Sequence, residues 1–127
     1  MTGREVFEYA VLRVVPRVER GECFNAGVLV YCGARSFVTA RTYLDERKLR
    51  ALDPRADVRG VQAALRAVEG VCGGGEGAGQ AADDDAGRRF RWLIAPRSTV
   101  LQPGTVHSGL TADPAAEADR LFDLLVR

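Results

Sequence analysis

Four arginines have the clearest capacity for chemistry, because each falls near the end of a predicted strand or in a neighbouring loop: Arg13, Arg20, Arg41 and Arg97. A guanidinium group presents a planar fork of hydrogen-bond donors that suits phosphate and carboxylate groups. If the strands pair as an antiparallel meander, the four side chains can gather into one anion pocket. The polar residues near them complete the candidate binding site: Glu22, Asn25, Ser98 and His107.

The alternative is that these arginines hold loops in place by pairing with carboxylates, namely Glu8, Glu19, Glu22 and Asp45. Ion networks of this kind are common in proteins and say little about function, so we favour this alternative. Both explanations use the same residues, and only their positions in space separate them.

Other patterns that resemble reactive sites each lack a defining part. The Gly-rich run at 70–87 has neither a Gly-Lys-Ser/Thr ending nor the G-x-G-x-x-G spacing of phosphate-binding loops. The run Asp83–Asp85 lacks the spacing of an EF-hand. Ser98, His107 and Asp113 can be drawn as a triad, but Ser98 is not in a nucleophile elbow. The sequence therefore predicts no catalytic residue, no metal site and no cofactor.

Composition limits the class of partner. The chain has 127 residues, enough for a single domain with its own hydrophobic core, and a net charge of +1. So balanced a charge argues against binding to nucleic acid or to an acidic membrane surface. No apolar run is long enough to cross a membrane. The three cysteines, Cys23, Cys32 and Cys72, lack zinc-ligand spacing, and we expect them to be reduced thiols in a cytoplasmic protein.

The elements that must position these residues begin with strands. Residues 6–15 predict a central strand, because both of its faces are largely apolar. Strands at 27–32 and 36–43 follow, after a polar loop in which Gly21 makes the turn and Asn25 closes it. A fourth strand is predicted at 98–102, and residues 105–109 are expected to be irregular.

Two helices are predicted after the meander. Asp45 is a suitable N-cap for a short helix that ends at Leu52. A longer helix is predicted over 54–71, with Asp53 as its N-cap and Pro54 in its first turn. An apolar stripe at helical spacing runs along it: Val58, Val61, Leu65, Val68 and Cys72.

The second half of the chain predicts a flexible Gly-, Ala- and Asp-rich loop at about 72–87. A segment at 88–94 then buries Phe90, Trp92 and Leu93, as a helix or as a strand. Asp113 and Pro114 begin a final helix. Strands first, then helices, then a late strand favour an α+β fold, a single domain with an antiparallel sheet of about four strands and helices packed on it.

Two long segments carry a family resemblance. The first comprises YAVLRVVP at 9–16 and RGECFNAGVL at 20–29, and the second comprises FRWLIAPRSTVLQP at 90–103 and VHSGLT at 106–111. They resemble a bacterial domain-of-unknown-function family, the one numbered 3037, over nearly the whole chain. The resemblance implies no activity and no catalytic residue. It does imply a partner, because members are often encoded beside a kinase-like protein resembling the HipA group.

These observations favour a small interaction module that works with a protein partner or as a homo-oligomer, and such a module needs an exposed apolar patch. The alternative is an enzyme or binding domain for a phosphorylated or carboxylated small molecule. That function requires the four arginines to converge, with His107 or Glu22 in reach as an acid or base. A nucleic-acid-binding protein fits least, because the charge is balanced.

Overall fold

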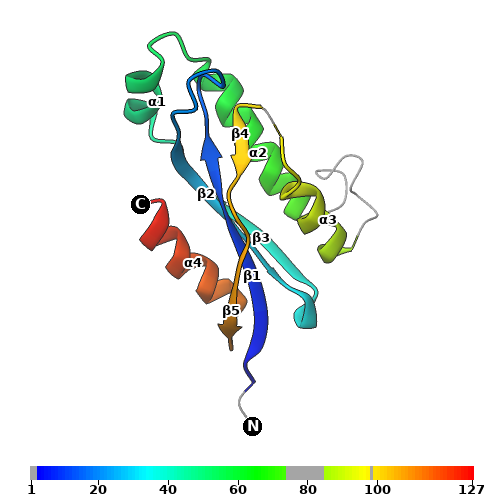
Figure 1. Ribbon diagram of the computed structural model, residues 1–127. Helices are drawn as coiled ribbons and strands as arrows, with labels where there is room; N and C mark the ends of the chain where they lie inside the picture. The colour runs from blue at the N-terminus through cyan, green and yellow to red at the C-terminus, as the bar shows by residue number, and fades with distance from the viewer. Residues whose placement is uncertain (1–2, 74–84, 98) are drawn as a thin grey trace.

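The computed structural model describes residues 3–73, 85–97 and 99–127 (Figure 1). The fold is α+β, as the sequence predicts, although the antiparallel sheet has five strands instead of four. The strands are β1 (Glu5–Val14), β2 (Phe24–Cys32), β3 (Phe37–Thr42), β4 (Leu101–Pro103) and β5 (His107–Thr111). The helices are α1 (Glu46–Leu52), α2 (Val58–Gly73), α3 (Ala86–Leu93) and α4 (Pro114–Leu125), with a short 3-10 turn at Gly33–Arg35.

β1 lies at the centre of the sheet. The strands are ordered β3-β2-β1-β4, and β5 also pairs with β1. β4 pairs with Leu12–Val14 and β5 pairs with Glu5–Tyr9, so the two short strands follow one another along the same edge of β1. The expectation that residues 105–109 are irregular was wrong at His107–Gly109. His, Ser and Gly have little strand propensity of their own, and here the pairing with β1 decides their conformation.

The loop between β1 and β2 is shorter than the sequence predicts. Gly21 makes the turn, with a φ of 71° that favours glycine. The prediction that Asn25 closes this turn was wrong, because β2 begins at Phe24 and Asn25 pairs with Arg13. A shift of register between Leu12 and Arg13 lets the ladder continue as far as Val14.

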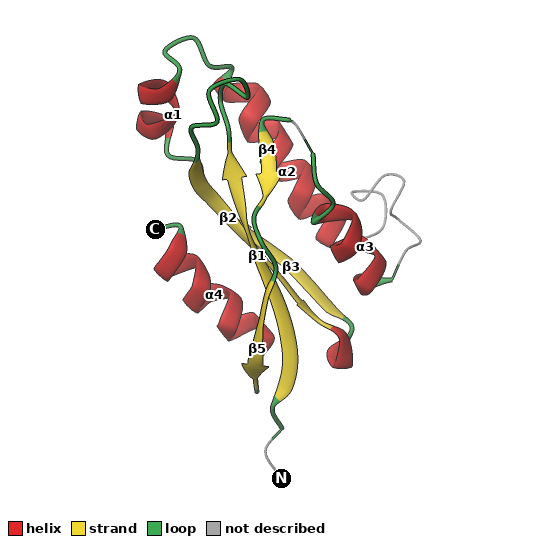
Figure 2. Ribbon diagram, in the orientation of Figure 1, coloured by secondary structure: helices red, strands yellow, loops and turns green. Residues whose placement is uncertain are grey.

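Helices cover both faces of the sheet, as the apolar pattern of β1 predicts (Figure 2). α2 and α3 pack on one face against Leu12, Val14 and Leu29. α4 packs on the other face against Val28 and Val30. Side chains of adjacent strand residues point to opposite faces, so β2 contributes alternately to the two clusters.

The predicted start of the long helix was wrong by four residues. Asp53 precedes Pro54, is extended, and ends α1 instead of beginning α2. Asp57 begins α2, because its Oδ1 accepts a hydrogen bond from the backbone N–H of Gly60 at 3.0 Å. The N-caps Asp45 and Asp113 are confirmed, and their carboxylates accept backbone N–H bonds in the first turns of α1 and α4.

Residues 88–94 are helical, and α3 starts slightly earlier, at Ala86, with Asp85 as its N-cap. The predicted loop at 72–87 was too long at both ends, because Cys72 belongs to α2 and Gly87 to α3; residues 74–84 lie outside the described residues. The prediction that Trp92 is buried was also wrong, since 51% of it is exposed. The buried residues of α3 are Ala86, Phe90 and Leu93. These fall on one side of a helix with 3.6 residues per turn, and Trp92 falls outside their stripe.

Candidate functional site

The predicted arginines do not gather into one pocket. Arg13 in β1 and Arg41 in β3 lie on the face that α4 covers, where Arg41 Nε donates to Asp119 Oδ1 of α4 at 2.9 Å. Arg97 lies on the opposite face, where it lines a hollow between α2, α3 and β4. Arg20 belongs to neither face, because it lies in the loop between β1 and β2.

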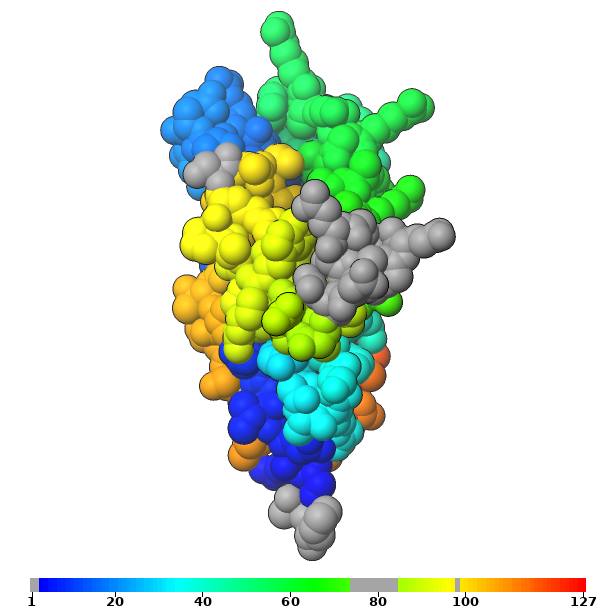
Figure 3. Space-filling model, turned by 90° about the vertical axis from the view of Figure 1, so that its right-hand side faces the viewer, coloured from blue at the N-terminus to red at the C-terminus, as the bar shows by residue number. Residues whose placement is uncertain are grey.

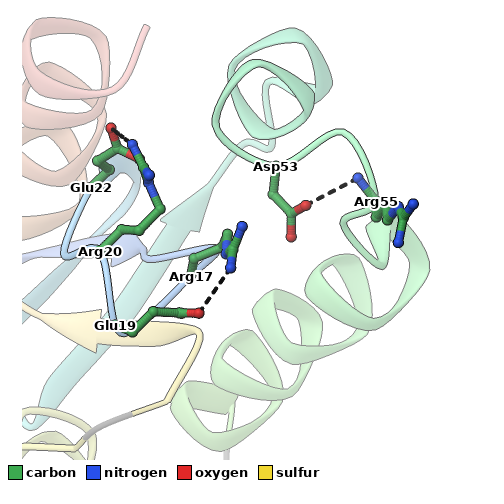
Figure 4. A network of polar contacts seen from close by, with 6 residues as sticks. All are labelled: Arg17, Glu19, Arg20, Glu22, Asp53 and Arg55. Carbon is green, nitrogen blue, oxygen red and sulfur yellow. Dashed lines mark hydrogen bonds and ion pairs between the residues drawn. The ribbon is translucent and has the colours of Figure 1, made fainter.

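Within that loop, arginines pair with near neighbours in the chain (Figure 4). Arg17 Nη2 donates to Glu19 Oε2 at 3.1 Å, and Arg20 holds both carboxylate oxygens of Glu22 at 2.7 and 3.1 Å. The bond from Arg20 lowers the pKa of Glu22. These contacts support the alternative explanation, in which arginines hold loops. Two of the carboxylates named in that explanation have other partners. Glu8 pairs with Arg91, and Asp45 caps α1.

The other predicted site residues are also separated. The side-chain amide of Asn25 donates to the carbonyl oxygen of Leu125 at 3.0 Å and so links β2 to the end of α4. His107 begins β5, and its ring centroid lies 5.3 Å from that of Tyr9. Ser98 lies outside the described residues.

An apolar pocket between α2, α3 and β4 is the strongest candidate for a binding site, and sequence reasoning missed it. Its volume is about 260 Å³. Almost all of its wall is aliphatic or aromatic: Leu12, Ala64, Ala67, Val68, Val71, Trp92, Leu93, Val100, Leu101 and Pro103, with Arg97 and Thr99. The hollow between α1 and the end of α4 is larger, but its wall includes Asp45, Lys48 and Arg127, which are ordinary surface charges.

Trp92 and Arg97 form the polar part of this pocket. The guanidinium carbon of Arg97 lies 4.7 Å from the centre of the Trp92 ring, and Nη2 donates to the Trp92 carbonyl oxygen. A cation over an indole ring is held there by the ring quadrupole. No carboxylate among the described residues pairs with Arg97.

Most of the pocket wall comes from a stretch of chain without acidic residues. Residues 86–112 include four arginines and none of the 17 acidic residues. In Figure 3, α3 and the residues after it, in yellow-green and yellow, cover the middle of the face that is turned toward the viewer. The missing acidic residues, together with a tryptophan outside the buried stripe of α3, are the signals from which the sequence could have indicated this surface.

The three cysteines differ in exposure, and burial makes the thiol of Cys72 less reactive. Cys32 and Cys72 are buried, Cys23 is exposed, and all three are free thiols. Burial raises the pKa of Cys72 to about 12, which keeps its thiol protonated at neutral pH. Among the described residues, no three His, Cys, Asp or Glu side chains gather where they would hold a metal ion. Within the same ranges, no helix has the length and apolar character to cross a bilayer.

The fold and pocket define a small α+β domain with an apolar surface hollow beside a stacked arginine and tryptophan. The chain belongs to the family described as protein of unknown function (DUF3037), whose model matches residues 9–126. Neither the curated proteins nor the solved structures include a match to the chain. The match to the family model confirms, over nearly the whole chain, the resemblance that the two long sequence segments indicate.

Proposed function

We propose that this domain is a binding module that docks apolar side chains of a partner protein in the pocket between α2, α3 and β4. The observation that carries the proposal is the half-exposed Trp92 on the wall of an apolar hollow, with Arg97 stacked on its ring. Tryptophan and arginine are enriched among the residues that dominate binding energy at protein interfaces.

The size of the pocket favours side chains over a metabolite. Pockets for small molecules usually enclose about 300–1,000 Å³ and bury most of the ligand. This pocket has a volume of about 260 Å³ and offers few polar groups to orient a metabolite. It has room for one or two apolar side chains of a partner segment.

The alternative, a site for a phosphorylated or carboxylated small molecule built from the four arginines, has less support. Arg41 is engaged by Asp119, Arg20 is engaged by Glu22, and Arg97 lies across the sheet from Arg13. A thermal-shift screen against phosphorylated metabolites tests it. A rise in midpoint that disappears in the Arg20→Ala, Arg97→Ala double variant would favour this alternative.

The proposed function is tested by panning a library of random peptides on the wild-type protein and on two variants. Ala67→Phe adds a ring to the pocket wall, and Ala116→Phe adds the same ring to an exposed position on α4, across the sheet. We expect wild type and Ala116→Phe to select peptides with apolar anchors, and Ala67→Phe to select none. Circular dichroism confirms that both variants are folded. Equal selection by all three proteins, or none by wild type, would reject the proposal.

The partner is a second protein or another copy of the chain. The first candidate is a kinase-like protein of the HipA group, which the family resemblance implies. Analytical ultracentrifugation over a range of concentrations identifies self-association, since a homo-oligomer held by this pocket would dissociate in Ala67→Phe. The three free thiols support a cytoplasmic setting for either partner.

A further inference from the structure

We infer that Arg97 selects a carboxylate next to the apolar anchor, so that the partner is an acidic, amphipathic protein segment. This inference rests on the proposed function, because it names the chemistry of the segment that docks in the pocket. It follows from three properties of Arg97: no carboxylate of the described residues pairs with it, its position is restrained, and its own stretch of chain has no acidic residue.

The first property is that no carboxylate in 3–73, 85–97 or 99–127 pairs with Arg97. Several other arginines that link elements of the fold are paired with carboxylates: Arg35 with Glu5, Arg41 with Asp119 and Arg91 with Glu8. Among the described residues, Arg97 makes its polar contacts with the ring and the carbonyl oxygen of Trp92. A guanidinium group has five N–H donors, so one bond to a carbonyl leaves most of its capacity for a ligand.

The second property is a fixed position at the pocket. Stacking on Trp92 and the bond to its carbonyl oxygen restrain the side chain on the wall that Leu93 and Val68 continue. Arg97 is partly buried there, which makes a bond to a carboxylate less exposed to water than one at an open surface. A restrained guanidinium also loses less side-chain entropy when it binds.

The third property is the charge of the surrounding chain. Arg97 lies in a stretch of 27 residues, 86–112, without Asp or Glu, so no carboxylate of its own segment competes for it. Charge complementarity therefore favours an acidic partner over a basic one. The aliphatic wall distinguishes a protein segment from nucleic acid, because a phosphate backbone has no apolar group to fill the pocket.

The experiment compares peptides selected by wild type with those selected by Arg97→Gln and Arg97→Lys. We expect Asp or Glu to be enriched beside the apolar anchor on wild type only. Arg97→Gln should keep the anchor and lose the acidic preference, and Arg97→Lys should lose most of it because lysine lacks the planar fork. Arg47→Gln, an exposed charge on α1, is the matched control and should select as wild type does.

One selected peptide and its Asp→Asn or Glu→Gln version then give the magnitude. The fluorescence of Trp92, the only tryptophan of the chain, reports binding to the pocket. On wild type we expect the neutral version to bind about tenfold more weakly, since charge-assisted bonds are stronger than neutral ones. On Arg97→Gln the two versions should bind equally, which isolates the pairwise contribution.

The outcomes separate the two proposals. Apolar anchors without an acidic preference on wild type would overturn the role of Arg97 and leave the binding module intact. No selected peptide at all would overturn the binding module itself. A 12-nucleotide oligothymidylate that displaces the bound peptide at equal concentration would overturn the assignment of an acidic protein segment in favour of nucleic acid.

Discussion

Arg91 and Arg97 show how the same residue type takes different roles on one face of the molecule. Arg91 lies over the rings of Tyr31 and Phe90 and holds Glu8 through two bonds, at 3.1 and 3.0 Å. This arrangement closes the end of α3 against β1 and raises the pKa of Arg91. Arg97 also lies over a ring, but no carboxylate of the described residues meets it. We therefore assign Arg91 to the fold and Arg97 to binding.

At the same scale, the cysteines are expected to differ in reactivity. Cys23 is exposed, whereas Cys32 and Cys72 are buried. At pH 8, a disulfide reagent such as DTNB should modify one thiol rapidly in wild type and none in Cys23→Ser. Both buried thiols should react only after denaturant is added. Rapid modification of a second thiol in the folded protein would contradict the burial of Cys32 and Cys72.

Cys72 also links stability to alkaline pH. Its pKa is about 12 in the folded protein and 9.0 in an unfolded chain, so the unfolded state loses the proton first as the pH rises. Its contribution to the free energy of unfolding is therefore complete below pH 9 and declines as the pH rises from 9 toward 12. Urea titrations at pH 8 and pH 10 should show that the free energy of unfolding falls less between these two pH values in Cys72→Ala than in wild type. An equal loss in both proteins would contradict this assignment.

At the scale of elements, the start of α2 depends on Asp57 and Gly60. The Asp57 carboxylate folds back over the first turn, and a Cβ at Gly60 would clash with Asp57 Oδ2. Asp57→Ala should lower the free energy of unfolding by about 0.5–2 kcal/mol, as the loss of an N-cap does. Asp57→Ser should retain most of the stability, because serine also caps. Urea unfolding measures the stability of both variants. If Asp57→Ala is as stable as wild type, Asp57 is not the N-cap of α2.

The same contact predicts that the effect of Gly60→Ala on stability depends on whether Asp57 is present. Alanine in place of glycine inside a helix ordinarily adds about 0.5–1 kcal/mol of stability. In wild type that gain should be offset, because the new methyl group displaces the capping carboxylate of Asp57. In the Asp57→Ala background the full gain should return. Equal gains in both backgrounds would show that Asp57 yields without losing its bond.

The accuracy of sequence-based prediction differs among the elements for physical reasons. Asp45 and Asp113 were identified correctly as caps, because each directly precedes an amphipathic helix. Asp53 was misassigned because Pro54 also suits a first helical turn, and only the structure shows which of two carboxylates, Asp53 or Asp57, bonds to the α2 backbone. β5 has little local signal, since its pairing with β1 joins residues about a hundred positions apart.

The candidate site was harder to predict than the fold. A pocket made by α2, α3 and β4 depends on how three separate segments pack, which no spacing in the sequence encodes. The expected convergence of the four arginines was not found, for a related reason. Arg13 and Arg41 share one face of the sheet, but the connection after α3 carries Arg97 to the other face. The sequence shows that these residues are arginines, but it does not show on which face of the sheet each one lies.

At the scale of the whole molecule, one sheet connects two apolar clusters. Val28 packs with α4 and its neighbour Leu29 packs with α2 and α3, and both are fully buried in β2. Loss of packing on either face therefore removes support from strands that the other face needs. A domain of this size is expected to unfold in a single transition for that reason.

This coupling predicts that a change under α4 is felt at Trp92, across the sheet. Leu121 is buried against β2, with 3% of it exposed, and Leu121→Ala should destabilise the protein by about 2–5 kcal/mol. The control is Leu124→Ala on the same helix. Leu124 is 68% exposed, so this substitution should change the free energy of unfolding by no more than about 0.5 kcal/mol. Trp92 fluorescence and circular dichroism at 222 nm should give the same urea midpoint for each protein, lowered only in Leu121→Ala. If helical signal is lost at lower urea than the Trp92 signal changes, α4 unfolds as a separate unit and the two clusters are not coupled through β2.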